Sequence, residues 1–162
     1  MSLVKAAFFD RDGTLIEEVP YLSDVKKIKI IPESMELCRK LQTEGYKLFI
    51  VTNQSGIARK FFPESFVQNT HKLLEKLFAE HKVYIEKYYY CPHHPDDNCE
   101  CRKPKPGMLV KASKEYNIDL SKSLMFGDKE IDVKAGEAVN CKSFYIQNIL
   151  EQKLDLFKER LL

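Results

Sequence analysis

Two aspartates separated by a single residue, Asp10 and Asp12, stand directly after the apolar run Val4 to Phe9. The run predicts a buried strand, and side chains two residues apart in an extended chain point the same way. Adjacent acids repel unless a cation or a proton separates them, and Mg²⁺ favours a few carboxylates together with water and substrate phosphate. The pair therefore predicts a magnesium site. For an Asp-x-Asp-Gly segment standing alone, a turn with two solvated acids would be the better interpretation.

Polar residues also follow two later apolar runs. Thr52 comes directly after residues 48–51. Asp128 comes after residues 124–126 and one glycine. In a parallel sheet the carboxyl ends of neighbouring strands open onto one edge, and ligands gather there. The sequence therefore predicts that Asp10, Thr52 and Asp128 converge on one site.

The residue types at this site fit phosphoryl transfer. Asp10 is the candidate nucleophile and would form an aspartyl-phosphate. Asp12 would protonate the leaving oxygen and then accept a proton from water. Thr52 offers a hydroxyl, and Lys103 would neutralise charge on the phosphoryl group. The predicted ligands of the Mg²⁺ ion are Asp10, Asp12 and Asp128.

The segments between these residues alternate between strands and helices. Strands are expected at 4–9, 48–51, 83–90, 124–126 and 143–146, and helices at 33–44, 63–79, 107–116 and 130–138. This alternation predicts an α/β fold, with a Rossmann-like parallel sheet covered by helices on both faces. The turn-rich segment 17–31 is expected to form a flap beside the carboxylates. The insertions after the first two strands are too short for a large cap domain, so we expect a single domain over residues 1–162.

The helix expected at 63–79 carries a stripe of apolar side chains that should face the core. We expect His71 and His81, on or near this helix, to be surface residues and not metal ligands. The stripe consists of Phe66, Leu73, Leu74, Leu77 and Phe78. In the tail from Ile149, apolar residues recur at helical spacing, which favours packing onto the body of the protein over binding a partner. These tail residues are Leu150, Leu154, Phe157 and Leu161.

Three of the five cysteines lie within the short segment 91–101. The predicted zinc ligands are Cys91, His93, Cys99 and Cys101. Three thiolates and an imidazole are a typical tetrahedral set for Zn²⁺. Four protein ligands leave the ion no open position, so its predicted role is structural: it would hold this zinc loop so that Arg102 and Lys103 face the phosphate. His94 is the spare imidazole, and a loop of reduced thiols is the alternative.

Composition and charge exclude several classes of protein. A net charge of +2 over 162 residues gives no reason to expect a nucleic acid or a membrane surface as partner. No stretch approaches the roughly 20 apolar residues that span a bilayer, and Lys5 interrupts any apolar N-terminal run that could serve as a signal peptide. Clustered cysteines are not a secreted disulfide framework. We therefore expect a cytoplasmic protein. A monomer is expected as well, but no pattern in the sequence determines the oligomeric state.

Four segments together resemble the motifs of the haloacid dehalogenase superfamily of phosphatases. They are Asp10-Arg11-Asp12-Gly13-Thr14, Thr52-Asn53, Lys103 and Gly127-Asp128. The resemblance runs from the start of the chain to about residue 140. It implies a Mg²⁺-dependent phosphatase in which Thr52 and Lys103 stabilise the phosphoryl group.

The zinc loop resembles a narrower group, the phosphatases of D-glycero-D-manno-heptose 1,7-bisphosphate and the related histidinol phosphatases. Segments 52–59 and 102–108 are similar to the heptose branch, whereas the five-residue gap between His93 and Cys99 is short, as in histidinol phosphatases. The heptose resemblance implies removal of the C7 phosphate, which leaves heptose 1-phosphate for nucleotide-activated heptose synthesis. Histidinol phosphate is the alternative substrate. A zinc-loop binding protein without catalysis is a third hypothesis.

The same resemblance implies contacts with the substrate, a small phosphorylated sugar. Arg102 would hold the distal phosphate. Lys129, beside Asp128, is either a substrate contact or an ordinary solvated lysine. The residues implied to line the sugar site are Glu18, Val19, Pro20, Tyr21, Thr52, Asn53, Gln54 and Ser55.

Overall fold

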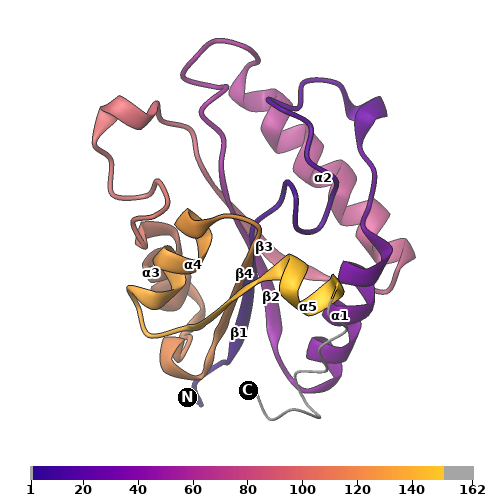
Figure 1. Ribbon diagram of the computed structural model, residues 1–162, viewed down its shortest axis with the longest axis vertical. Helices are drawn as coiled ribbons and strands as arrows, with labels where there is room; N and C mark the ends of the chain where they lie inside the picture. Colours follow the sequence, from indigo (N-terminus) through magenta and orange to yellow (C-terminus); the bar gives the residue numbers. More distant parts are fainter. Residues whose placement is uncertain (1, 152–162) are drawn as a thin grey trace.

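The computed structural model describes residues 2–151 and contains a five-stranded parallel sheet (Figure 1). The strands are β1 (Ala6–Phe9), β2 (Lys47–Asn53), β3 (Ile85–Cys91), β4 (Leu124–Gly127) and β5 (Lys142–Tyr145). Their order across the sheet is β3-β2-β1-β4-β5. The Rossmann-like α/β fold predicted from the alternation of elements is therefore confirmed.

The central strand β1 is buried along its whole length. It pairs with β2 on one side and β4 on the other, with Phe9 opposite Ile50 and Phe126. A parallel strand covered on both faces needs apolar side chains at every position, which explains the unbroken apolar run in the sequence. The chain builds outward from β1 through β2 to β3 and then returns to the other side of β1. This reversal puts the topological switch point, where α/β sheets bind ligands, at the ends of β1 and β4.

Helices cover both faces of the sheet (Figure 1). One face packs against α1 (Pro32–Thr43), α2 (Glu64–Glu80) and α5 (Ile146–Glu151). The other packs against α3 (Gly107–Tyr116) and α4 (Glu130–Glu137). Side chains of β1 alternate between the two cores: Ala7 and Phe9 join the first, and Ala6 and Phe8 join the second.

The prediction for α2 was wrong in two respects. Its fully buried face is formed by Val67, Thr70, His71, Leu74 and Phe78, whereas Phe66, Leu73 and Leu77 are only half-buried. His71 is 5% exposed and not a surface residue. The reason is that α2 also packs against the loop after β1, where the buried side chain of Arg11 needs a polar partner. Polar residues therefore belong to the buried face of α2, and a prediction from apolar residues alone misplaces that face.

Element boundaries differ from the predictions by a few residues. Thr52 and Asn53 are the last residues of β2 and do not follow it. Ile146 begins α5 and does not end β5. The segment 17–31 carries one short 3₁₀ helix, Val25–Lys27, a turn at residues 20–21 and a single bridge from Ile30 to Ile16.

No large cap domain covers the sheet within the described residues 2–151, as expected from the short insertions. In the same range no helix is long and apolar enough to cross a bilayer. Most of the apolar tail, including Leu154, Phe157 and Leu161, lies outside the described residues.

Candidate functional site

A cavity of about 320 Å³ opens at the carboxyl edge of the sheet. It brings together parts of the chain that are far apart in sequence: the end of β1, the end of β2, the start of the 17–31 loop, the residues after the zinc loop and the start of α4. The cavity is lined by Asp10, Arg11, Asp12, Glu18, Val19, Pro20, Tyr21, Leu22, Thr52, Asn53, Gln54, Ser55, Gly56, Arg102, Lys103, Lys129, Ile131 and Asp132. All the predicted catalytic and substrate residues are among them.

Lys103 is buried at the base of this cavity between two carboxylates. Its Nζ donates to Asp10 Oδ1 at 2.8 Å, to Asp132 Oδ1 at 2.6 Å and to the carbonyl of Val51 at 2.8 Å. Burial opposes the charge, but Asp10 and Asp132 outweigh it and hold the pKa of Lys103 above its ordinary value. The lysine is thus a fixed positive charge beside Asp10, which suits a phosphoryl group carrying negative charge.

Asp132 is the site residue that the sequence analysis missed. It is 1% exposed, and its Oδ2 also accepts from the backbone N–H of Lys129 at 3.0 Å, which caps the first turn of α4. An acid at the third position of a predicted helix is a recognisable capping signal. That signal predicts the helix cap, but it does not predict that Lys103 also donates to Asp132.

Asp10, Asp128 and Asp132 each offer an oxygen within 4.8 Å of the other two. Burial raises the pKa of Asp128, and its Oδ1 is buried without a hydrogen-bond partner. When all three carboxylates are ionised, the single charge of Lys103 leaves about two negative charges in the cluster uncompensated. An orphaned carboxylate oxygen in such a cluster fits a divalent, oxygen-seeking cation such as Mg²⁺.

Gly13 allows Asp128 to approach this cluster. Its φ is +80°, and a Cβ at this position would lie 2.3 Å from Oδ2 of Asp128. Any other residue would be strained in the backbone and would displace the carboxylate.

The carboxylate of Asp12 is not part of this acidic cluster. Arg11 holds it with two hydrogen bonds, Nε to Oδ2 at 2.9 Å and Nη2 to Oδ1 at 3.2 Å. The side-chain amide of Gln54 donates to Asp12 Oδ2 at 3.2 Å and to Thr52 Oγ1 at 2.9 Å. The side chain of Asp12 therefore pairs with Arg11 and Gln54 on the Thr52 side of the cavity, and its roles in proton transfer and Mg²⁺ binding stay predictions.

Two further basic residues, Lys129 and Arg102, line the cavity. Lys129 Nζ pairs with Glu18 Oε1 at 2.8 Å and joins the start of α4 to the 17–31 loop. This contact is half-exposed, so it is worth little to stability. Arg102 lines the cavity, and its Nη1 is buried without a protein partner.

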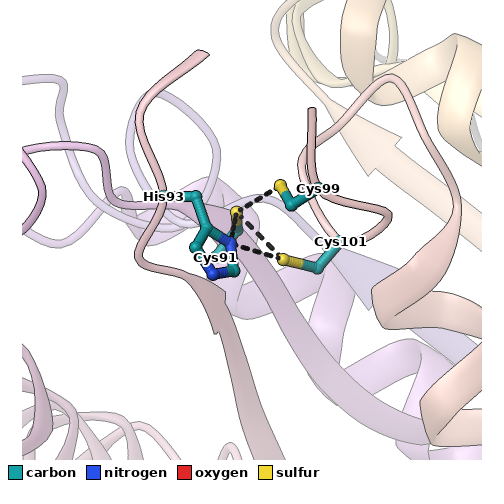
Figure 2. Close-up of side chains that lie close together, drawn as sticks. All are labelled: Cys91, His93, Cys99 and Cys101. Atoms are coloured by element: carbon teal, nitrogen blue, oxygen red, sulfur yellow. Dashed lines mark hydrogen bonds between the residues drawn. The ribbon is translucent and has the colours of Figure 1, made fainter. Parts of the chain in front are cut away.

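The four predicted zinc ligands gather in one cluster (Figure 2). Cys91 Sγ lies 3.1 Å from Cys101 Sγ and 3.6 Å from Cys99 Sγ, and His93 Nδ1 lies 3.2 Å from Cys101 Sγ. A tetrahedron with metal–sulfur bonds of about 2.3 Å has edges of about 3.8 Å, so the donor set fits one zinc ion. His94 lies apart from the cluster and caps the short 3₁₀ helix Pro95–Asp97.

Two contacts fasten the zinc loop beside the cavity. The side chain of Asn53, at the end of β2, accepts from the backbone N–H of Lys103 at 3.0 Å and donates to its carbonyl at 3.2 Å. Gly107, at the start of α3, packs so closely on Glu100 that a Cβ would lie 2.2 Å from the Glu100 carbonyl oxygen. The backbone on either side of Lys103 is therefore held in place.

Comparison with known proteins shows the family of the chain. The model of the haloacid dehalogenase-like hydrolase family matches residues 19–140. The chain belongs to the haloacid dehalogenase-like hydrolases. Within this family it is 42% identical over 145 residues to the D-glycero-beta-D-manno-heptose-1,7-bisphosphate 7-phosphatase of Pasteurella multocida, covering 86% of this chain and 79% of that protein.

A Helicobacter pylori hydrolase of the same name is 40% identical over 154 residues, covering 93% of this chain and 89% of its own. Among solved structures, D,D-heptose 1,7-bisphosphate phosphatase from B. bronchiseptica, complexed with magnesium and phosphate, superimposes with a TM-score of 0.82. It is 26% identical and covers 93% of this chain and 87% of that one. The similarity thus extends over nearly the whole haloacid dehalogenase-like fold.

Proposed function

We propose that this protein hydrolyses D-glycero-D-manno-heptose 1,7-bisphosphate at C7, releasing heptose 1-phosphate and inorganic phosphate for nucleotide-activated heptose synthesis. The observation that carries the proposal is the shared cavity: Asp10 lies against buried Lys103, and Arg102 lines the same cavity with an unpartnered guanidinium nitrogen. The relatives named for this reaction, at about 40% identity, favour the heptose substrate over histidinol phosphate.

The reaction runs in two steps on this chain's own side chains. A carboxylate oxygen of Asp10 attacks phosphorus, the bond from phosphorus to the C7 oxygen breaks, and Asp12 gives that oxygen its proton. Water then attacks the aspartyl-phosphate and loses a proton to Asp12, and the bond to Asp10 breaks to release phosphate. Lys103 and Thr52 hold the phosphoryl oxygens in both steps.

Asp10 and Asp128 would hold Mg²⁺, because Asp128 has the unpartnered oxygen and Asp132 is already bonded to Lys103 and the start of α4. When bound, the ion offsets the repulsion between the nucleophile and the phosphate. Zinc, in contrast, would be structural, since its four ligands leave no open position.

Arg102 is the candidate contact for the distal phosphate. A guanidinium forms paired, charge-assisted hydrogen bonds with phosphate, and its buried Nη1 lacks a protein acceptor. Glu18 to Tyr21 and Thr52 to Ser55 line the sugar site beside it. Lys129 is a further contact, held at the cavity mouth by Glu18. We infer a monomer with a single domain, working in a reducing, cytoplasmic compartment where the zinc thiolates stay unoxidised.

The test compares wild type with Asp10→Asn on heptose 1,7-bisphosphate in the presence of Mg²⁺. We expect phosphate release to fall by at least about 10³-fold, because the amide is no nucleophile, with an unchanged circular dichroism spectrum. Undiminished release would eliminate the aspartyl-phosphate route.

Substrate choice is tested by kcat/KM on heptose 1,7-bisphosphate and on histidinol phosphate, with Arg102→Ala as the variant. Arg102→Ala should lose more activity on the bisphosphate than on the monophosphate, because only the former has a second phosphate to bind. Equal losses on both substrates, or a preference of wild type for histidinol phosphate, would contradict the heptose assignment. Absence of Mg²⁺-stimulated turnover on any phosphate ester would favour a binding protein without catalysis.

A further inference from the structure

A chain of buried polar contacts leads from α2 to the proposed general acid. Arg11 has one of the largest fully buried side chains in the described residues. Two of its nitrogens bond both oxygens of Asp12, and the third, Nη1, lies 3.1 Å from Nε2 of His71. The guanidinium is therefore occupied by Asp12 and His71. It lines the cavity, and each of its three nitrogens makes one contact in this network, which accounts for three of its five N–H donors.

His71 is in turn held rigidly on α2. Its ring stacks on Tyr88 with centroids 4.8 Å apart and lies 5.9 Å from the ring of Tyr90, both on β3. Burial, helped by the charge of Arg11, lowers the pKa of His71 to about 3. The imidazole is thus neutral at physiological pH, and its Nε2 is free to accept from Arg11. No reaction step assigned above uses this histidine.

An arginine that contacted only Asp12 would hold the carboxylate weakly, because fixing its long side chain costs conformational entropy. The contact between Arg11 and His71 fixes the arginine when the protein folds, so this entropy is not lost again during catalysis. With Nη1 fixed by His71, the other two donors present one planar edge that matches a carboxylate. This arrangement sets both the position and the rotation of Asp12.

We propose that Arg11 and His71 are positioning residues that hold Asp12 in line for proton transfer to the leaving oxygen. The inference rests on the proposed role of Asp12 in phosphate ester hydrolysis. It predicts a defect that depends on the leaving group. A sugar alkoxide needs a proton from Asp12 as it departs, whereas 4-nitrophenolate departs without one.

The experiment measures kcat/KM of His71→Phe on heptose 1,7-bisphosphate and on 4-nitrophenyl phosphate, both with Mg²⁺. This constant reports the steps up to aspartyl-phosphate formation, so the later hydrolysis does not enter. Phenylalanine keeps a ring to stack on Tyr88 but removes the acceptor for Arg11. We expect kcat/KM to fall about tenfold to hundredfold on the sugar ester and less than about threefold on the aryl ester. On the sugar ester the loss should be in kcat, with KM nearly unchanged.

Three further variants make the result specific. His71→Gln keeps an acceptor and should restore the ratio of the two kcat/KM values to within about threefold of wild type. Arg11→Lys keeps the charge but cannot bridge Asp12 and His71. It should lower kcat/KM on the sugar ester selectively, as His71→Phe does, and it replaces that variant if His71→Phe does not fold. His81→Phe, at the end of the same helix and outside the network, should leave the ratio unchanged.

Two outcomes would overturn the inference. If His71→Phe lowers both substrates by the same factor, or neither, His71 does not act through Asp12. Asp12→Asn separates this failure from a failure of the proposed function. If Asp12→Asn selectively lowers the sugar ester and His71→Phe does not, only the positioning role is lost. If Asp12→Asn also lowers both esters equally, the acid role of Asp12 and the inference fail together.

Discussion

At the scale of single residues, the buried carboxylate of Asp132 connects the site residue Lys103 with the first turn of α4. It accepts from Lys103 through one oxygen and from the start of α4 through the other. Lys103 is 1% exposed at its side chain, so its charge depends on Asp10 and Asp132 for compensation. Removing Asp132 would leave buried Lys103 with Asp10 as its remaining carboxylate partner and no water in place of the lost one.

Asp132→Ala should therefore lower the free energy of unfolding by about 3 kcal/mol. Urea denaturation measures this loss. Glu137→Gln, an exposed change on the same helix, serves as the matched control and should stay within about 0.5 kcal/mol of wild type. Equal stabilities for the two variants would show that the buried lysine does not need Asp132.

A second residue-scale prediction concerns Asp10 and Mg²⁺. In the metal-free protein burial raises the pKa of Asp10 from 3.8 to about 7, a rise that Lys103 opposes and Asp132 adds to. Between these values the folded protein holds a proton that the unfolded chain has lost. Stability of the metal-free protein should thus fall as the pH rises through this window.

Mg²⁺ must displace this proton at about pH 5 but not at about pH 8, so the rise in Tm that it causes should be larger at the higher pH. Thermal unfolding with and without excess Mg²⁺ at the two pH values measures the difference. Asp128→Asn, which removes the unpartnered carboxylate, should reduce the rise at the higher pH. A rise that is equal at both pH values would argue against a metal held by Asp10.

At the scale of elements, the zinc loop contains no helix or strand beyond Cys91 at the end of β3 and one short 3₁₀ turn, and Arg102 and Lys103 follow it directly. Such a segment buries little apolar surface, so the cluster of four donors and the contacts of Asn53 must fix it. Metal binding of this kind contributes directly to folding free energy.

Purified protein should contain about one zinc per chain, and Cys99→Ser should lower both the zinc content and the free energy of unfolding, the latter by at least about 2 kcal/mol. Metal analysis and urea denaturation provide the two measurements. His94→Asn is the matched control, because His94 lies in the same loop outside the cluster, and its zinc content should be that of wild type. Full zinc occupancy after combined Cys99→Ser and Cys101→Ser would refute the assignment.

At the scale of the whole molecule, the short insertions leave the cavity open to solvent, with Arg102 and Lys129 in its lining. The net charge of the chain is only +2, so attraction of a bisphosphate comes from these local charges. Solvent-exposed charges are screened over about 10 Å at 0.1 M salt, and buried pairs are screened much less.

Raising the ionic strength from about 0.05 to about 0.5 M should therefore lower kcat/KM severalfold on the bisphosphate and less on 4-nitrophenyl phosphate. Steady-state kinetics at several salt concentrations test this. The kcat at saturating substrate should change little, because Lys103 and Asp10 are buried. A fall in kcat as large as that in kcat/KM would indicate an effect of salt on the folded site and not on substrate capture.

The sequence by itself determined the features that depend on neighbouring residues. Apolar runs ending in Asp10, Thr52 and Asp128 indicate strands and their carboxyl ends, and the spacing of the zinc ligands is visible in one short segment. The Rossmann-like sheet follows from the alternation of elements. These signals are local, since propensity, periodicity and ligand spacing are set within a few residues.

Only the tertiary structure decided which partner each buried charge takes. Lys103 meets Asp10 from 93 residues away and Asp132 from 29, and Arg11 meets His71 from 60. The carboxylate of Asp12 bonds to Arg11 and Gln54, and His71 is buried in the interior. A buried polar group needs a hydrogen-bond partner, and tertiary packing determines which residue is near enough to be that partner. Patterns among neighbouring residues in the sequence do not contain this information.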